Sequence, residues 1–445
     1  MNHFAIARQE TMKTASDPAT QGLAKRVCVI FDLQGRIRIL AELEDQHDAN
    51  VFQQRLNTQL AAVAPGFWTG VCWFQRGEKH ALGRLSPSER SLYEAVWREA
   101  KPCPEAPHFC FHLDRRYSKD GWFDTSGTPP WDYVETKTPP IVSFYSYKGG
   151  VGRSTAMASV AIQCARAGKR VLTVDFDLEA PGLASIFPPP SKFPPEVGIL
   201  DFLIEYPVVG KDFHTGDLIH VYDQKDVVGS GEIRVAPAGR VDPWYLEKLS
   251  RLDYQRMAPS PQLANSAGCT LLHDLLSALR KSVEPDIILL DSRAGLHDLG
   301  GLALSTLAHW DVLFGLDSSQ SWDGLRLAIA HLGRERVEAG AVQRDCLIVQ
   351  SMAKPQGGQE SIERFRQNSY AVFCGEYYDD AANTNAEWPV PDELASDQPH
   401  YPLSLVHDNR VMGYAQMDAV VAGYLCEGNF KNLYDVLTGK LGMKI

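Results

Sequence analysis

The 445-residue sequence lacks the features that would direct it out of the cytoplasm. Its first residues contain no apolar core of a signal peptide, and no uninterrupted apolar run approaches the ~18 residues of a membrane span. Its nine cysteines include no C-x-x-C pair and their number is odd, so no disulfide framework is legible. These absences argue against a secreted disulfide scaffold and predict a soluble cytoplasmic protein that does not bind membranes.

An excess of positive charge is also missing. The chain carries 44 Lys and Arg residues against 55 Asp and Glu residues, which gives a formal net charge of −11. This balance argues against a general affinity for nucleic acid through a basic surface, although it leaves a local basic patch open. The length predicts two or three domains, each with enough apolar residues for a core.

The N-terminal part predicts a small domain of its own. Residues 1–24 are polar, and we expect them to be disordered. Residues 25–124 alternate short β-type runs with two segments of helical spacing, which is typical of an α+β domain. No motif in this domain indicates a chemistry. Residues 125–140 are rich in Pro and Thr and are expected to form a linker, so a second domain spans residues 141–445.

The most informative stretch begins the second domain. Ile141–Tyr147 is mostly apolar and rich in β-formers, which predicts a buried strand. Lys148–Gly152 then supplies three glycines, and Ser154 and Thr155 open a segment of helical composition. Glycine lets backbone N–H groups surround an anion, and a helix N-terminus favours phosphate there. The pattern therefore predicts a phosphate-binding loop.

Strands and helices then alternate along the rest of the chain. Five further runs read as strands: Val171–Phe176, Ile287–Leu290, Asp311–Leu316, Asp345–Gln350 and Ile233–Ala236. This alternation predicts an α/β fold with a doubly wound, mostly parallel sheet. Asp175 and Asp177 end the first of these runs, and Asp291 follows the second. Ligands of open α/β sheets bind at the carboxyl ends of the strands, so these acids are expected beside the phosphate loop.

Three motifs together carry a family resemblance. They read YKGGVGRST, VDFDLEAPGL and DIILLDSRAGL, and they resemble the ParA/MinD class of phosphate-loop ATPases, with the lysine placed just before the paired glycines. The likeness covers about Ile141–Leu441. It is strongest to a branch in which Arg replaces the usual Lys, here Arg153, and whose members recur in bacterial signalling and conflict proteins. A guanidinium is larger than an ammonium, so this departure bears on the rate of hydrolysis more than on binding.

The resemblance implies a nucleotide site built on this loop. Nine residues would bind the nucleotide: Lys148, Gly149, Gly150, Val151, Gly152, Arg153, Ser154, Thr155 and Gly295. Arg153 would reach the β- and γ-oxygens, Thr155 the α-phosphate, and Gly295 would offer its N–H to the γ-phosphate as a switch. Mg²⁺ would be held by Ser154, Asp177 and Asp291.

The same resemblance implies the catalytic residues. Asp177 would orient the attacking water, and Asp175 matches the first acid of the same D-x-D motif. Lys148 would cross a dimer interface to the phosphates of a second subunit, adding positive charge where the transition state gathers negative charge. The role of Arg293 stays open between a transition-state cation and an ion pair with Glu179 or another acid, with the ion pair favoured.

These observations predict an ATP-binding, slowly hydrolysing switch with ATP and Mg²⁺ as cofactors. ATP is expected because the N-K-x-D motif of typical GTPases is absent. An ATP-dependent homodimer that regulates or recruits a partner protein is implied by the resemblance. Two alternatives remain: a catalytically weak nucleotide-binding scaffold in a larger complex, and a ParA-type ATPase that positions DNA or cargo, against which the acidic balance argues. The amphipathic segment Asn429–Ile445 is expected to pack on its own domain rather than on a membrane.

Overall fold

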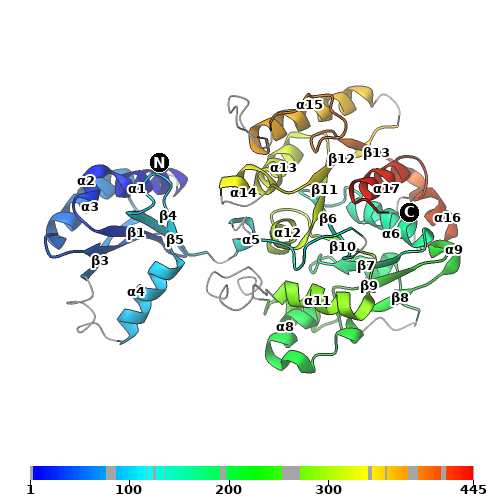
Figure 1. Ribbon diagram of the computed structural model, residues 1–445, viewed down its shortest axis with the longest axis horizontal. Helices are drawn as coiled ribbons and strands as arrows, with labels where there is room; N and C mark the ends of the chain where they lie inside the picture. The colour runs from blue at the N-terminus through cyan, green and yellow to red at the C-terminus, as the bar shows by residue number, and fades with distance from the viewer. Residues whose placement is uncertain are drawn as a thin grey trace. The chain divides into compact units, whose positions relative to one another are not determined.

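The computed structural model describes residues 4–76, 87–116, 118–123, 127–135, 137–190, 197–252, 271–338, 343–355, 358–378, 389–411 and 417–443. The chain divides into two compact units, residues up to 118 and residues from 119 onward. Figure 1 shows the helices and strands of each unit.

The first unit is a five-stranded sheet with helices on both faces. Its strands are β1 (Arg26–Phe31), β2 (Ile37–Leu43), β3 (Trp68–Arg76), β4 (Lys101–Pro102) and β5 (Cys110–Asp114), in the order β3-β2-β1-β5-β4. Its helices are α1 (Phe4–Ser16), α2 (Pro18–Gln21), α3 (Ala49–Val63) and α4 (Pro87–Glu99). Strands β1 and β2 pair in the antiparallel direction and form a hairpin. Because side chains alternate along β1, Val27 and Val29 pack with α1 and α3, whereas Cys28 and Ile30 pack with α4.

The segment expected to be disordered, residues 1–24, contains α1 and α2 instead. Ala7, Thr11 and Ala15 of α1 are buried at helical spacing, and Arg8 forms an ion pair with Asp114 of β5 at 2.9 Å. The expectation of disorder rested on the polar composition of this segment. Small residues at a spacing of four let the helix approach the sheet closely, and this narrow apolar face is hard to recognise in a polar sequence.

The second unit is built on an eight-stranded sheet in the order β13-β12-β11-β6-β10-β7-β9-β8. The strands are β6 (Ile141–Ser146), β7 (Arg170–Asp175), β8 (His220–Tyr222), β9 (Glu232–Ala236), β10 (Ile287–Asp291), β11 (Trp310–Gly315), β12 (Cys346–Ala353) and β13 (Leu403–Val406). All neighbouring strands are parallel except β8 and β9. The predicted α/β fold with a mostly parallel sheet is therefore confirmed. The short edge strands β8 and β13 were not predicted.

Helices cover both faces of this sheet (Figure 1). They are α5 (Asp120–Phe123), α6 (Arg153–Arg166), α7 (Leu183–Ile186), α8 (Ile199–Val209), α9 (Lys225–Val228), α10 (Tyr245–Leu249), α11 (Leu271–Val283), α12 (Asp298–Leu302), α13 (Ser319–Leu332), α14 (Arg334–Glu338), α15 (Gln359–Glu376), α16 (Ala419–Tyr424) and α17 (Gly428–Lys440). Helices α6, α16 and α17 form one core with one face of the sheet. On the other face, α8 and α11 form a second core and α13 and α15 form a third. Strand β6 lies at the centre and is buried on both sides, so its carboxyl end carries the loop that follows it into a fixed position.

The C-terminal helix packs on its own domain. Leu433 and Leu437 of α17 are buried in the core that α6 shares, and Ser159 of α6 donates a hydrogen bond to the carbonyl of Leu425 at 2.6 Å. The expectation that the segment from Asn429 packs on its own domain therefore agrees with the position of α17. None of the helices in the described ranges has the length and apolar character needed to span a bilayer.

Asp311 carries a carboxyl group inside the sheet whose protonation can be tested. It is fully buried on β11 and accepts a hydrogen bond from Ser143 Oγ of β6 at 2.5 Å, and burial raises the pKa of Asp311 to about 7. The pKa of an Asp in the unfolded chain is about 4, so the unfolded state loses its proton first. The free energy of unfolding therefore falls as the pH rises from about 4 to about 7. We expect Asp311→Asn to be more stable than wild type at pH 8, on the order of 2–4 kcal/mol, and to lose this advantage near pH 4.5.

Urea unfolding of the two proteins at both pH values measures this difference. An equal difference in the free energy of unfolding at pH 4.5 and pH 8 would show that the folded protein does not hold Asp311 in its neutral form.

Candidate phosphate-binding site

The loop between β6 and α6 has the backbone of an anion-binding turn. Gly150 and Gly152 have φ values of +71° and +81°, in the region that costs other residues about 1–2 kcal/mol. Gly152 is the N-cap of α6. Apart from the adjacent residues in the chain, no atom lies within 4 Å of the position that a Cβ of Gly149 or Gly150 would take. The predicted glycines therefore bend the chain around open space at a helix N-terminus, where the helix dipole favours an anion.

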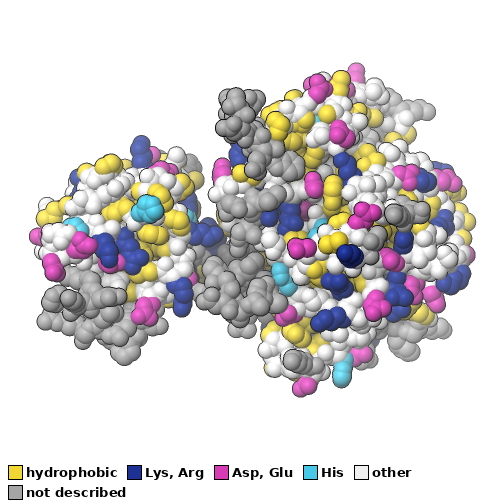
Figure 2. Space-filling model, viewed as in Figure 1, with side chains coloured by type: hydrophobic (Ala, Val, Ile, Leu, Met, Phe, Trp, Pro, Cys, Tyr) yellow, Lys and Arg dark blue, Asp and Glu magenta, His cyan; other side chains and the backbone are white. Residues whose placement is uncertain are grey.

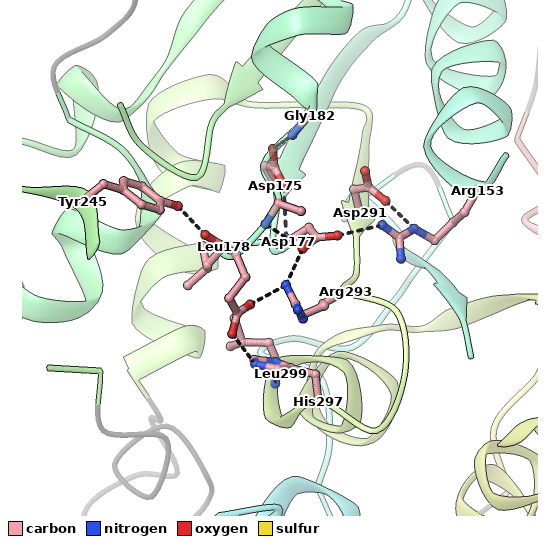
Figure 3. A network of polar contacts seen from close by, with 12 residues as sticks. Arg153, Asp175, Asp177, Leu178, Gly182, Tyr245, Asp291, Arg293, His297 and Leu299 are labelled. Carbon is pink, nitrogen blue, oxygen red and sulfur yellow. Dashed lines mark hydrogen bonds and ion pairs between the residues drawn. The ribbon is translucent and has the colours of Figure 1, made fainter. Parts of the chain in front are cut away.

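Arg153, the first residue of α6, points at two carboxylates (Figure 3). Its Nε lies 2.7 Å from Asp291 Oδ1, and a terminal nitrogen lies 3.4 Å from Asp177 Oδ2. The side chain is only 8% exposed. The resemblance predicts that Arg153 reaches phosphate oxygens, whereas in this structure it neutralises the two acids. A guanidinium has more N–H donors than these two contacts use, so donors remain for an anion.

Asp175 anchors the loop that follows β7. It is completely buried and accepts hydrogen bonds from the backbone N–H groups of Asp177, Gly182 and Leu183 at 3.0–3.1 Å. Asp175 and Asp291 are register partners on neighbouring strands. Burial, followed by the charge of Asp291, raises the pKa of Asp175 to about 7. These are the contacts of a residue that shapes the loop; its catalytic role stays a prediction.

Asp291 brings the predicted metal ligands together. It ends β10 and is 2% exposed, and burial raises its pKa, while the charge of Arg153 and a hydrogen bond with Ser154 oppose that rise. Asp177 is connected to Asp291 through Arg153. A hydroxyl and two carboxylates are the oxygen donors that Mg²⁺ prefers when substrate phosphates complete its shell. Ser154, Asp177 and Asp291 therefore fit the magnesium site that the sequence predicts.

Asp177 is also held from its other side by a row of alternating charges (Figure 3). Arg293 contacts Asp177 Oδ1 at 3.1 Å and Glu179 Oε2 at 2.8 Å. Glu179 Oε1 in turn lies 2.8 Å from His297 Nε2. Burial raises the pKa of Glu179, but the contacts with His297 and Arg293 outweigh it and leave the pKa below its usual value. The predicted ion pair between Arg293 and Glu179 is confirmed.

Two of the predicted nucleotide-binding residues differ in their present contacts: Gly295 already uses its N–H, whereas Lys148 has no partner among the described residues. The N–H of Gly295, which was expected to contact a γ-phosphate, donates to the carbonyl of Ser146 at 3.0 Å. Gly295 has a φ of +78°, and its carbonyl accepts a hydrogen bond from Tyr145 Oη at 3.2 Å. Binding of a phosphate by this N–H would require the bond to Ser146 to break. Lys148 is half-exposed, and no hydrogen bond or ion pair joins it to another residue of the described ranges.

A pocket adjoins the loop on the side of α6. Val151, Gly152 and Thr155 form one wall, and Met352 and His407 contribute to the other. Thr155, predicted to contact an α-phosphate, therefore lies between the loop and a partly apolar hollow. Its outer wall comes from the carboxyl ends of β12 and β13, which the sequence analysis did not connect with the site.

Sequence reasoning missed His297 and Tyr245. Tyr245, the first residue of α10, donates a hydrogen bond to the carbonyl of Leu178 at 2.6 Å. This bond holds the loop that follows β7 against α10. Nothing in the sequence connects these two distant residues. His297 comes directly after the DSRAGL motif and precedes a helix, and this position was a signal that could have been used.

A family model described as an AAA domain matches residues 140–182. The predicted resemblance to ParA/MinD-type phosphate-loop ATPases is confirmed over this segment. The match contains β6, the phosphate loop, α6, β7 and the loop that Asp175 anchors. No curated protein matches the sequence.

Several solved structures are similar to the second unit. One is the cell division ATPase MinD of Pyrococcus furiosus, with 19% identity, a TM-score of 0.41 and coverage of 68% of this chain and 100% of that one. Another is a putative plasmid partition protein of Borrelia burgdorferi B31 bound to AMPPNP, with 15% identity, a TM-score of 0.42 and coverage of 68% and 100%. A third is pNOB8 ParA bound to nonspecific DNA, with 15% identity, a TM-score of 0.41 and coverage of 68% and 99%. TM-scores in this range do not decide a fold, so the architecture rests on the strand order and the loop.

The loop backbone provides a matched pair of variants. Gly149 and Gly150 both have open space beside them, but only Gly150 has a positive φ. We expect Gly150→Ala to lower the free energy of unfolding by about 1–2 kcal/mol, whereas Gly149→Ala is close to neutral. Denaturant unfolding without nucleotide measures both. Equal stabilities of the two variants would contradict the left-handed conformation at Gly150.

Proposed function

We propose that this protein is an ATP-binding switch that hydrolyses ATP slowly. The observation that carries the proposal is the loop after β6, which bends around open space at the N-terminus of α6 and lies beside two carboxylates from neighbouring strand ends. Phosphoryl transfer needs positioned phosphates, a divalent cation and an oriented water. This part of the sheet offers residues for each requirement.

The phosphates would be bound by the backbone N–H groups of Gly150–Thr155. Ser154, Asp177 and Asp291 would hold Mg²⁺, which when bound neutralises charge on the β- and γ-phosphate oxygens. Asp177 would accept a hydrogen bond from the attacking water, and Arg153 would share its guanidinium between phosphate and acid. Because a phosphate oxygen competes with Asp291 for Arg153, binding is coupled to a rearrangement of this ion pair.

The network around Asp177 offers a physical reason for slow hydrolysis. Asp177 faces Arg153 on one side and Arg293 on the other. While both arginines contact its oxygens, Asp177 is not free to accept a hydrogen bond from the attacking water. Turnover would therefore require nucleotide or a second subunit to draw at least one arginine away.

The hollow beside Thr155, which Met352 and His407 also line, has a volume of about 40 Å³ and is too small for a nucleoside. The absence of N-K-x-D favours ATP over GTP.

Dimerisation is the second part of the proposal. Lys148 is half-exposed at the start of the loop. The family resemblance implies that a lysine in this position contacts the nucleotide bound to a second copy of the chain. Gly295 would exchange its hydrogen bond with Ser146 for one with the γ-phosphate, which makes the segment after β10 sensitive to the nucleotide. The closed dimer would recruit or release a partner protein, and the branch resemblance associates such a role with bacterial signalling or defence.

Two other functions remain candidates. The pairing of Arg153 with both acids would suit a scaffold that holds nucleotide and hydrolyses it poorly. A DNA-positioning ATPase is disfavoured by the net charge of −11, and Figure 2 shows acidic and basic side chains interspersed over the visible face of the second unit. Salt-sensitive retention on nonspecific DNA in the presence of ATP would favour this last function.

Replacement of Asp177 tests the catalytic assignment. We expect Asp177→Ala to bind ATP·Mg²⁺ and remain dimeric while phosphate release falls about a hundredfold or more, because no group then orients the water. Light scattering and released phosphate are measured on the same samples, with Asp435→Ala as a control on the exposed face of α17. Turnover at the wild-type rate would remove Asp177 from the catalytic role, and an unchanged mass without phosphate release in the wild type would favour the scaffold.

The variant Arg153→Lys distinguishes an ATPase that is slowed by the contact between Arg153 and Asp177 from a nucleotide-binding scaffold. A lysine ammonium is a compact charge on a shorter side chain and does not reproduce the two separated N–H contacts of the planar guanidinium, so we expect the contact with Asp177 to be lost. We expect the variant to bind ATP and release phosphate severalfold faster than wild type, while Arg166→Lys near the other end of α6 changes neither property. Loss of ATP binding by a folded Arg153→Lys protein would show instead that the guanidinium itself binds the phosphates.

A further inference from the structure

The second unit begins with a short segment that is seated on α12. This connecting segment, Lys119–Phe123, follows directly on the first unit in the chain and contains α5. A Cβ on Gly121 would lie 2.7 Å from Leu302, and a Cβ on Gly301 would lie 2.8 Å from the ring of Trp122. The two short helices touch so closely that only glycine fits at either position. Movement of α12 therefore moves the connecting segment.

Lys119 attaches the segment to the first residue of α12. Its backbone N–H and its Nζ both contact the carboxylate of Asp298, the second at 2.8 Å, and Asp298 is 3% exposed. Lys119 has a φ of +75°, a left-handed conformation that is unfavourable for a residue other than glycine. Such strain persists where surrounding contacts impose it, and it is concentrated at sites with a function.

His297 connects this contact with the phosphate site. Its Nδ1 accepts a hydrogen bond from the N–H of Leu299 at 3.3 Å, which caps α12. The proton of the neutral ring is therefore on Nε2, which donates to Glu179 at 2.8 Å. The carbonyl of the same residue accepts a hydrogen bond from Trp122 Nε1 at 2.8 Å. One residue thus contacts the helix cap, the connecting segment and the acid that holds Arg293.

We propose that Asp177, Arg293, Glu179 and His297 form a relay through which the occupancy of the phosphate site regulates the connecting segment. The proposal rests on the proposed nucleotide function. When phosphate and a cation occupy the site, Asp177 turns to them and gives up Arg293, whose remaining partner in the relay is Glu179. The contact between Glu179 and His297 then changes, and with it the position of α12 under Trp122 and Lys119. The coupling is reciprocal, so the state of the connecting segment also sets how firmly Asp177 is held.

The chain offers a matched control for Glu179, the central residue of the relay. Glu179 is 27% exposed and bridges Arg293 and His297 at 2.8 Å each. Glu232 is 26% exposed and bridges Arg170 and Arg234 at 2.8 and 3.0 Å, but it lies at the start of β9, away from the carboxyl ends of the strands. Both replacements by Ala remove one acid from between two basic groups, and only one of them interrupts the relay.

Hydrogen exchange of the full-length chain, read by mass spectrometry over residues 119–123, tests the relay. Without nucleotide, we expect Glu179→Ala to speed exchange there by about threefold or more and Glu232→Ala to leave it unchanged. In the wild type, AMPPNP·Mg²⁺ is expected to change exchange in the same residues, and Glu179→Ala is expected to abolish that response.

Each result decides between distinct conclusions. If Glu179→Ala leaves residues 119–123 unchanged without nucleotide, the relay does not reach the connecting segment and the inference is wrong. If AMPPNP binds with no change at residues 119–123, the site does not regulate this segment. If AMPPNP does not bind, as measured by calorimetry on the same protein, the proposed nucleotide function fails and with it the regulatory role, while faster exchange in Glu179→Ala would still show the mechanical connection.

Discussion

The ion pair between Arg153 and Asp291 is the interaction on which the rest of the site depends. It joins the first turn of α6 to the end of β10, with the guanidinium 8% exposed and the carboxylate 2% exposed. Removal of one partner from a buried pair of this kind costs about 3–5 kcal/mol, because an uncompensated charge remains. Asp175 and Asp291 are register partners; burial and the charge of Asp291 raise the pKa of Asp175, and the positive charge of Arg153 opposes the rise that burial causes in the pKa of Asp291.

The parallel sheet explains why these acids meet. Asp175 and Asp291 are register partners at the carboxyl ends of β7 and β10, and β6 ends beside them with the glycine loop. Asp175 uses its oxygens on three backbone N–H groups, so the loop that carries Asp177 has a defined shape before any ligand arrives. Such a site is preorganised for an anion and a cation together: the loop offers backbone N–H groups to phosphate, and the carboxylates at the strand ends offer oxygen ligands to a cation.

The same network extends from the phosphate site to the segment with which the second unit begins. Arg293 and Glu179 continue the charge alternation from Asp177 to His297, which caps α12. The close glycine contacts between α12 and α5 then leave little room for independent movement. A switch that has to report on its nucleotide needs an element with two arrangements, and the segment from Gly295 to α12 is the part of the site whose hydrogen bonds a phosphate would compete for.

The sequence by itself determined the local features of this protein. The apolar runs predicted β6, β7, β10, β11 and β12, and the glycine spacing predicted the loop, because strand burial and positive φ depend on residue type at the position itself. Contacts between distant segments were decided only by the tertiary structure. The helix α1 depends on a sheet that covers its small residues, and the edge strands β8 and β13 depend on a neighbour to pair with. Likewise, Arg153 points at Asp291, Gly295 donates to Ser146, and His297 reaches Glu179 because the fold places these partners within hydrogen-bonding distance, which no local pattern records.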